Sequence, residues 1–296
     1  MSTLVLIIGS IVVFLIAYTT YGAYLAKQWG IDPTRKTPAH EMNDGMDYVP
    51  TKPAVLLGHH FASIAGAGPI NGPIQAAIFG WVPVLLWIII GCIFVGGVHD
   101  FGSLFASVRH KGKSIGEVIH VNMGRKGKML FSLFAWLTLL LVVAAFTNIV
   151  ASTFASVPAA ASSSLMFIVL AIVFGYLVYR KGVSLKIGTI LGVIILFLCV
   201  YLGYVFPVQL SLNTWIIVLM IYIYAASTAP VWILLQPRDY LNSFLLYAMI
   251  AGAVIGIVIF NPSIQLPALT GFNVNGQLLF PMLFVTVACG AISGFH

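Results

Sequence analysis

The stretch Gly58–Pro73, GHHFASIAGAGPINGP, decides how the rest of the chain is interpreted. It lies in a long apolar region, yet it combines two adjacent histidines with glycines, two prolines, a serine and an asparagine. Lipid offers no water to a broken backbone, so irregular structure at membrane depth is stable only where protein buries it or where it lines a wet cavity. The stretch therefore predicts an interrupted helix that forms part of a transport site.

The composition around this stretch indicates a membrane protein. Of the 296 residues 60% are hydrophobic and only 7% are charged, and the mean hydropathy is +1.06. Soluble domains carry about 25% charged residues. We expect an all-α polytopic membrane protein, with residues 1–296 forming a single transmembrane domain and no separate soluble domain.

The apolar runs predict about eight or nine transmembrane helices, since a helix needs about 20 apolar residues to cross the hydrocarbon core. The expected spans are 3–26, 54–80, 82–108, 129–154, 163–179, 187–206, 213–235 and 241–260, with a further run from Leu278. The chain stops at His296 within that run, which predicts a truncated chain.

The basic residues set the expected orientation. All fourteen lie in alternate connections, within 27–53, 109–128, 180–186 and 236–240, whereas the connections between these carry no charge. This distribution follows the positive-inside rule. It places the N-terminus outside, makes 27–53 and 109–128 cytoplasmic loops, and explains the net charge of +7 without nucleic acid.

The prolines locate the expected interruption near 68–73. Pro69 disfavours helix at the residue before it, and Pro73 suits the first turn of a second half-helix capped by Asn71 or Gly72. The N-terminus of such a half-helix attracts anions. The alternative is a helix-packing face built from small residues. The predicted substrate-binding residues are Gly66, Gly68, Pro69, Asn71, Gly72, His59, His60 and Ser63.

The two histidines cannot share one face of a helix, because adjacent side chains diverge by about 100°. An intramembrane histidine can carry a proton near neutral pH. Handling of protons or substrate by His59 and His60 is one interpretation, and structural hydrogen bonding or metal binding are the alternatives.

Asp100 is the leading candidate for proton coupling, together with His60. It lies inside the apolar run that contains VHDF, where an unpaired carboxylate is costly. The alternative is a structural role, in which the Asp100 carboxylate pairs with an arginine or with a helix end. The adjacent pair Arg238 and Asp239, in LLQPRDYL, is predicted to lie in a turn at a span end, as a gate or as a topological anchor.

No cofactor or metal is expected. The three cysteines, Cys92, Cys199 and Cys289, lie in apolar segments without metal-type spacing. Neither an HExxH nor a GxSxG pattern accompanies the histidines.

The chain resembles the carbon starvation protein A family of bacterial inner-membrane proteins. The matching strings are DYVP (47–50), GHHFASIAGAGPINGP (58–73), VHDF (98–101), LLQPRDYL (234–241), PALT (267–270) and FPMLFVTVACGAISGFH (280–296). The resemblance implies starvation-induced uptake of peptides or pyruvate, with a pyruvate–proton symporter branch. It also implies a fold like that of amino-acid/polyamine/organocation transporters.

The functional prediction is therefore a secondary active transporter in the bacterial inner membrane that takes up an anionic peptide or pyruvate with protons. The sequence has no Walker A string for ATP use. A membrane-embedded enzyme, and a channel or nutrient sensor, are the alternatives. A homo-oligomer is left open.

Overall fold

The computed structural model describes residues 2–45, 48–229 and 234–292, almost entirely as helices. The chain divides into two compact units, one made of Met1–Pro50, Ile64–Met129 and Met249–His296, the other of Thr51–Ser63 and Leu130–Ala248. That all 296 residues form one transmembrane domain stays a prediction.

Six of the described helices are long and apolar enough to cross a membrane. They are Thr3–Gln28, Trp81–Arg109, Ile115–Ser156, Pro158–Val178, Leu185–Val205 and Leu235–Phe260. Two shorter apolar helices are Leu212–Thr228 and Leu279–Ala291. The prediction of an all-α polytopic membrane protein is confirmed.

The first unit begins with one continuous helix made of α1 (Thr3–Ala17), a π-helical segment η1 (Tyr18–Gly22) and α2 (Ala23–Gln28), and α3 (Pro38–Glu41) is a short helix in the polar loop. A second continuous helix consists of α6 (Trp81–Ile90), a π-helical segment η3 (Gly91–Gly96) and α7 (Gly97–Arg109).

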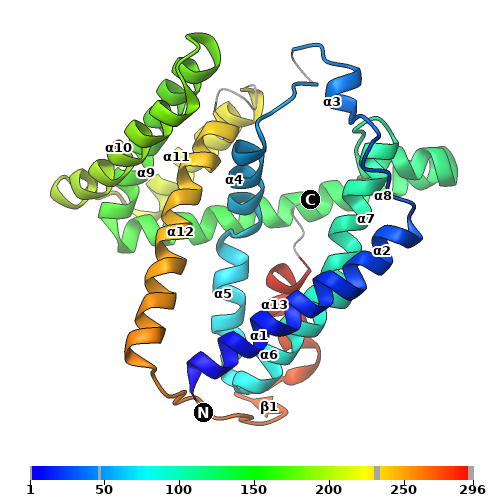
Figure 1. Ribbon diagram of the computed structural model, residues 1–296. Coiled ribbons are helices and arrows are strands. Elements are labelled where there is room, and N and C mark those ends of the chain that lie inside the picture. The colour runs from blue at the N-terminus through cyan, green and yellow to red at the C-terminus, as the bar shows by residue number, and fades with distance from the viewer. Residues whose placement is uncertain (1, 46–47, 230–233, 293–296) are drawn as a thin grey trace. The chain divides into compact units, whose positions relative to one another are not determined.

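The core of this unit lies where α5 (Ala67–Ala76) runs beside α13 (Leu279–Ala291) (Figure 1). Its buried side chains are Ala76, Phe79, Val84, Leu283, Val287 and Ala291. A short 3-10 segment, η2 (Ala77–Phe79), leads from α5 into Gly80, whose φ of +103° only glycine adopts readily. The strands β1 (Asn273–Val274) and β2 (Gln277–Leu278) form a small antiparallel hairpin before α13.

Helix α8 (Ile115–Ser156) bends at Gly124, where φ is +79°. Three basic residues, Arg125, Lys126 and Lys128, follow the bend, and the long apolar segment begins at Met129. Lys128 and Glu117 form an ion pair across the bend. The sequence-based expectation of a span over 129–154 agrees with the apolar part of this helix.

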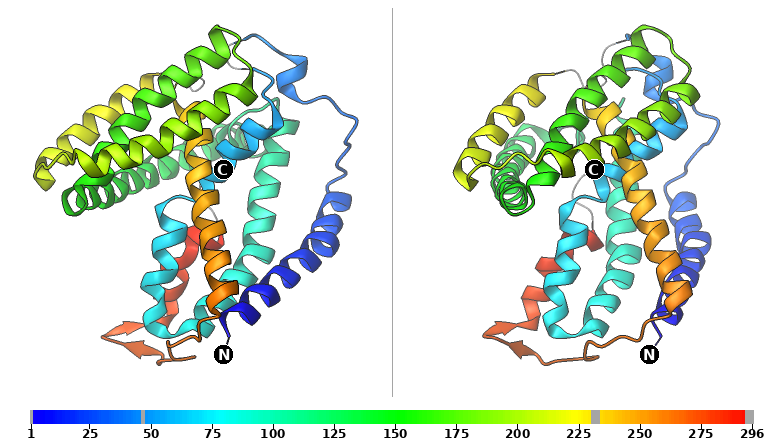
Figure 2. Two further views of the ribbon diagram at one scale, coloured as in Figure 1. Left: turned by 60° about the vertical axis from the view of Figure 1, so that its left-hand side comes forward. Right: turned by 90° about the vertical axis from the view of Figure 1, so that its left-hand side faces the viewer.

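In the second unit α9 (Pro158–Gly175), which continues into η4 (Tyr176–Arg180), lies beside α10 (Leu185–Val205) (Figures 1 and 2). The unit also contains most of α4 (Pro53–Ile64), α11 (Leu212–Thr228) and the first half of α12 (Leu235–Phe260). One core cluster joins α4, α9, α10 and α12 through Val55, Leu170, Phe174, Leu196, Tyr240 and Leu241. A second cluster consists of Ala151, Ala161 and Trp215.

Candidate functional site

The residues Arg238 and Asp239 lie on a helix, not in the predicted turn between spans. Helix α12 begins at Leu235, so Pro237 is its third residue. The first four N–H groups of a helix have no intrahelical acceptor, so a proline in the first turn removes no hydrogen bond. The prediction of a turn at Arg238 and Asp239 was wrong for this reason.

Helix α4 approaches α12 closely at Gly58. A Cβ atom on this glycine would lie 3.0 Å from Ser243 Oγ and 3.0 Å from Tyr240 Cδ2, both on α12. A larger residue would push the two helices apart. The glycine thus brings the next residue, His59, within reach of the start of α12.

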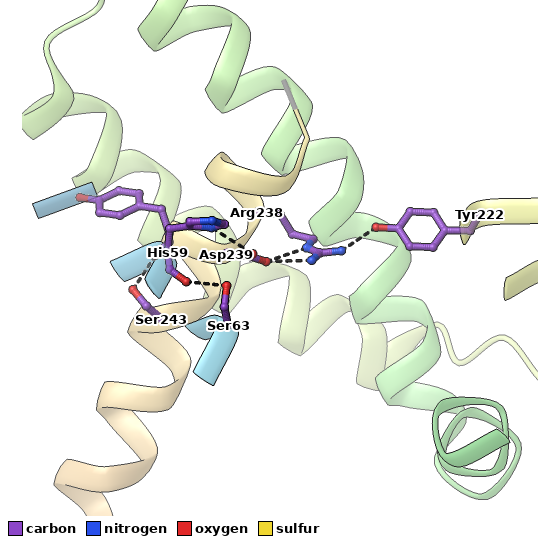
Figure 3. A network of polar contacts seen from close by, with 7 residues as sticks. His59, Ser63, Tyr222, Arg238, Asp239 and Ser243 are labelled. Carbon is purple, nitrogen blue, oxygen red and sulfur yellow. Dashed lines mark hydrogen bonds and ion pairs between the residues drawn. The ribbon is translucent and has the colours of Figure 1, made fainter. Parts of the chain in front are cut away.

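Four side chains from three helices form what we call the polar cluster: His59 of α4, Tyr222 of α11, and Arg238 and Asp239 of α12 (Figure 3). The Arg238 guanidinium contacts Asp239 Oδ1 through Nε at 2.9 Å and through Nη2 at 2.8 Å. Its Nη1 donates to the Tyr222 hydroxyl at 2.8 Å. His59 Nδ1 lies 3.1 Å from the other oxygen, Asp239 Oδ2.

The His59 contact is close without being aligned as a hydrogen bond. The imidazole Nδ1 is buried and makes no well-directed hydrogen bond in the described structure, although the carboxylate oxygen is within ion-pair distance. Ser63 does not redirect the ring, because its hydroxyl donates to the His59 backbone oxygen at 2.8 Å. The His59 ring therefore lies within ion-pair distance of the carboxylate, with no hydrogen bond from Nδ1 in the described structure.

The polar cluster is neutral when His59 is neutral, since Arg238 and Asp239 cancel. The Asp239 side chain is 14% exposed and that of Arg238 is 28% exposed. Removing either charge would leave the other one unpaired in an apolar surrounding, which is far more costly than losing a surface pair. Arg238 and Asp239 therefore each need the charge of the other to be stable in this position.

The predicted interruption is present but lies earlier than 68–73. Helix α4 ends at Ile64 and α5 begins at Ala67, with Gly66 as the extended N-cap residue. Pro69 is the third residue of α5, where its missing N–H has no consequence, so it does not end a helix. The predicted cap at Asn71 or Gly72 was wrong, because both residues lie inside α5.

The stretch from Pro69 to Gly72 packs against α13. A Cβ atom on Gly72 would overlap the backbone oxygen of Thr286, and Gly290 approaches Pro69 from the other helix. These contacts favour a packing role for Gly72. The predicted substrate-binding role of Gly66, Gly68, Pro69, Asn71 and Gly72 stays a prediction.

The remaining predicted residues are dispersed. His60 follows His59 on α4 and is exposed. Asp100 lies on α7 of the other compact unit, where its Oδ1 is 2.9 Å from His99 Nδ1. The structure thus groups His59, Arg238 and Asp239, which the sequence had assigned to different roles. The roles of His60 and Asp100 are untested.

Tyr222 was missed by the sequence analysis. The available signal was a tyrosine hydroxyl in the middle of the apolar run of α11, since a buried tyrosine usually finds a hydrogen-bond partner. No group of three or more His, Cys, Asp or Glu side chains within the described ranges is placed to hold a metal ion.

A separate apolar cavity lies in the first unit, beside the two π-helical segments. It has a volume of about 670 Å³ and its lining includes Tyr18, Tyr21, Cys92, Ile93 and Phe101. Its lining is apolar apart from hydroxyl groups and one thiol, so it offers no charged group to an anion.

These features define a polytopic helical membrane protein with a broken helix and an ion-paired cluster among apolar helices. The chain belongs to the carbon starvation protein CstA family, whose family model matches residues 2–296. The resemblance inferred from the sequence is confirmed.

Several curated relatives are similar over the whole chain. A protein of Campylobacter jejuni named peptide transporter CstA is 39% identical, over 100% of this chain and 44% of its own length. The pyruvate/proton symporter BtsT of Escherichia coli is 38% identical, over 100% of this chain and 43% of its own. The peptide transporter CstA of Bacillus subtilis is 37% identical, over 100% of this chain and 52% of its own.

The chain therefore spans about half the length, or less, of these curated relatives. No solved structure matches it.

Proposed function

We propose that the protein acts as a secondary active transporter that takes up peptides or pyruvate together with protons, during carbon or nutrient starvation. The relatives named as peptide transporters and as a pyruvate/proton symporter support this function. We further propose that it lies in the bacterial inner membrane with its N-terminus outside. Protons and a small anion are its proposed partners, and a homo-oligomer stays a prediction.

The observation that carries the proposal is the polar cluster. Ionisable side chains among apolar helices are expensive and mark ion or substrate pathways. Here a permanent cation, Arg238, lies beside a carboxylate, Asp239, and a titratable ring, His59. The cation can bind an anionic substrate, and the His59–Asp239 pair can bind and release a proton.

Further residues complete the proposed site. We also propose the N-terminus of α5 as an anion-attracting position, since no side chain caps it at Gly66 and the first N–H groups of a helix lack intrahelical acceptors. Asp100 and His60 remain candidates for proton coupling. His59 and Asp239 join them, because they lie 3.1 Å apart.

The test is uptake by the protein, expressed at its full length and reconstituted in proteoliposomes. Labelled pyruvate, a dipeptide and a tripeptide are offered in turn, with and without an inward proton gradient. We expect one class of substrate to accumulate above its outside concentration only when the gradient is present.

Three results would contradict the proposal in different ways. Entry that stops at equal concentrations would indicate a channel. Release of hydrolysis products would indicate an enzyme. Failure to take up any of the compounds, by protein that is folded in the vesicles, would reject the transporter assignment for these substrates.

A further inference from the structure

The carboxylate of Asp239 is divided between two neighbours. Its Oδ1 receives both contacts from Arg238, through Nε at 2.9 Å and Nη2 at 2.8 Å, whereas its Oδ2 lies 3.1 Å from His59 Nδ1. One oxygen thus belongs to a permanent cation and the other to a group that can bind or release a proton. The carboxylate could stay with His59 if Arg238 found another acceptor.

The Arg238–Asp239 pair is suboptimal for a guanidinium. Side chains at successive positions of a helix diverge and do not face each other, yet the Arg238 guanidinium contacts the carboxylate of its sequence neighbour. It contacts a single oxygen, whereas guanidinium groups bind carboxylates best through two parallel bonds to two oxygens. An external carboxylate could offer both of its oxygens.

Tyr222 holds the far side of the guanidinium in place. Its hydroxyl accepts from Nη1 at 2.8 Å and comes from another helix, α11. Three of the five N–H donors are then directed to Asp239 and Tyr222, and the other two have no partner among the described residues. The guanidinium is therefore oriented by two partners, Asp239 and Tyr222.

We propose that Arg238 is the residue that binds the carboxylate of the transported anion, and that this anion displaces Asp239 from Arg238 onto His59. The inference rests on the proposed transport function and names its substrate-binding group. It requires a substrate with a free carboxylate, which pyruvate and the C-terminus of a peptide both supply.

Charge balance links this exchange to a proton. Before exchange, Arg238 and Asp239 neutralise each other. After exchange, Arg238 is neutralised by the substrate, and Asp239 leaves one negative charge in an apolar surrounding, which is costly. One proton taken from the aqueous side by the His59–Asp239 pair restores neutrality. It leaves when the substrate leaves and Asp239 returns to Arg238.

The helices around Asp239 supply few other groups for this proton. Helix α4 contributes His59 and, one position further, His60, while α11 contributes Tyr222. Helices α9 and α10 meet α12 through Phe174, Leu196 and Thr189, the last bonded to the Tyr240 hydroxyl. The His59–Asp239 pair is the arrangement whose atoms lie in direct contact.

The experiment measures substrate binding and proton-driven uptake separately, with the full-length protein. For Arg238→Gln we expect the dissociation constant of pyruvate or dipeptide to rise at least about tenfold, since the charged partner of the carboxylate is gone. For Asp239→Asn we expect binding to be retained or about two- to tenfold tighter, since the internal competitor is gone. Uptake driven by the proton gradient should nevertheless fall at least about tenfold in Asp239→Asn.

Matched controls use the same chemical changes at exposed positions. Arg125→Gln and Asp32→Asn change residues that are exposed and should bind and transport as the unmodified protein does. If Asp239→Asn fails to fold, Arg238→Lys keeps the charge but not the planar fork, and should weaken binding about three- to tenfold. In the unmodified protein, a pH-sensitive dye inside the vesicles should report one proton for each carboxylate taken up.

Two results would overturn the inference while leaving the transport proposal standing. One is normal accumulation by the unmodified protein together with unchanged substrate affinity in folded Arg238→Gln or Arg238→Lys. The other is loss of substrate binding in folded Asp239→Asn. Absence of accumulation by the unmodified protein would instead reject the transport proposal itself, and this inference with it.

Discussion

At the residue scale, glycines determine how closely neighbouring helices pack. In α10 a Cβ atom on Gly203 would lie 2.7 Å from the backbone oxygen of Ala159 and would overlap Ser163, both on α9. In α12, by contrast, a Cβ atom on Gly252 would meet nothing within 4 Å. The same substitution therefore has opposite consequences at these two helical positions.

We expect Gly203→Ala to destabilise the protein by about 1–3 kcal/mol, since α9 and α10 must move apart to admit the methyl group. Gly252→Ala is the matched control and should be neutral or stabilising by up to about 1 kcal/mol, because alanine favours a helix over glycine. Thermal unfolding midpoints in detergent measure both effects. Equal midpoints for the two variants would contradict the close packing at Gly203.

Three residues of the polar cluster could be predicted from the sequence one by one, but their contacts could not. The sequence indicated His59 as an intramembrane ionisable group and the pair Arg238 and Asp239 as charges at a span end, because charge in or beside an apolar run is visible without coordinates. It could not bring them together, since 180 positions separate His59 from Asp239 and their contact depends on the close approach at Gly58. Tyr222 was not predicted as a member of the polar cluster, because tyrosines are common in apolar runs.

At the scale of elements, the prolines follow one rule. Pro53 and Pro158 are the first residues of α4 and α9, and Pro69 and Pro237 are the third residues of α5 and α12. In all four places the missing N–H would have had no intrahelical acceptor. Pro73 differs, because it lies inside α5.

We expect Pro73→Ala to stabilise α5, since it restores one N–H donor and removes the clash of the proline ring with the preceding turn, an effect of up to about 3 kcal/mol. Pro69→Ala should change the stability by much less. Neither variant should join α4 to α5, because the break lies at Ala65 and Gly66.

The measurement for both is the thermal unfolding midpoint, with uptake recorded beside it. A larger gain in midpoint for Pro69→Ala than for Pro73→Ala would contradict the helix boundary at Ala67. If Pro73→Ala gains stability but loses uptake, the proline is retained for transport and not for folding.

The position of the break shows how local rules can mislead. In the sequence, Pro69 and Pro73 predict the boundary of a helix and therefore an interruption near 68–73. The structure places it just before Pro69, because a first turn accepts proline. The composition of the stretch was enough to predict that the helix is interrupted. The position of the interruption could not be predicted, because it depends on which helical turn Pro69 and Pro73 occupy.

At the scale of the whole molecule, the ends of the described helices agree with the alternation of charge along the chain. Arg109 ends α7, Arg180 ends η4, and Lys186 is the second residue of α10. The connections 206–211 and 261–278 carry no charged residue. This pattern supports the proposed orientation with the N-terminus outside.

We expect cysteines substituted at Ser211 and Gln265 to react with a membrane-impermeant maleimide in intact cells. Cysteines at Lys36 and Lys181 should react only after the membrane is opened. Cys92, Cys199 and Cys289 are first replaced by serine, and a permeant maleimide serves as the control for reactivity. Labelling of Lys36→Cys in intact cells would reverse the orientation.

The fold class and the family were predictable because both are distributed along the whole sequence, as hydropathy and as strings such as GHHFASIAGAGP. The division into two compact units was not predicted. Each unit combines segments that are distant in the sequence, and hydropathy carries no information on which apolar helices pack together.

The three π-helical segments, η1, η3 and η4, have a consequence for how such a chain can change its length in evolution. A π turn closes its hydrogen bond one residue further along than an α turn, so each segment accommodates one additional residue within an otherwise regular helix. Loss of a single residue inside Gly91–Gly96 would convert η3 to α-helix and leave the helices on either side, α6 and α7, facing as before. A loss elsewhere in those helices would rotate every following side chain by about 100°. Single-residue length differences among natural relatives should therefore gather at these three places.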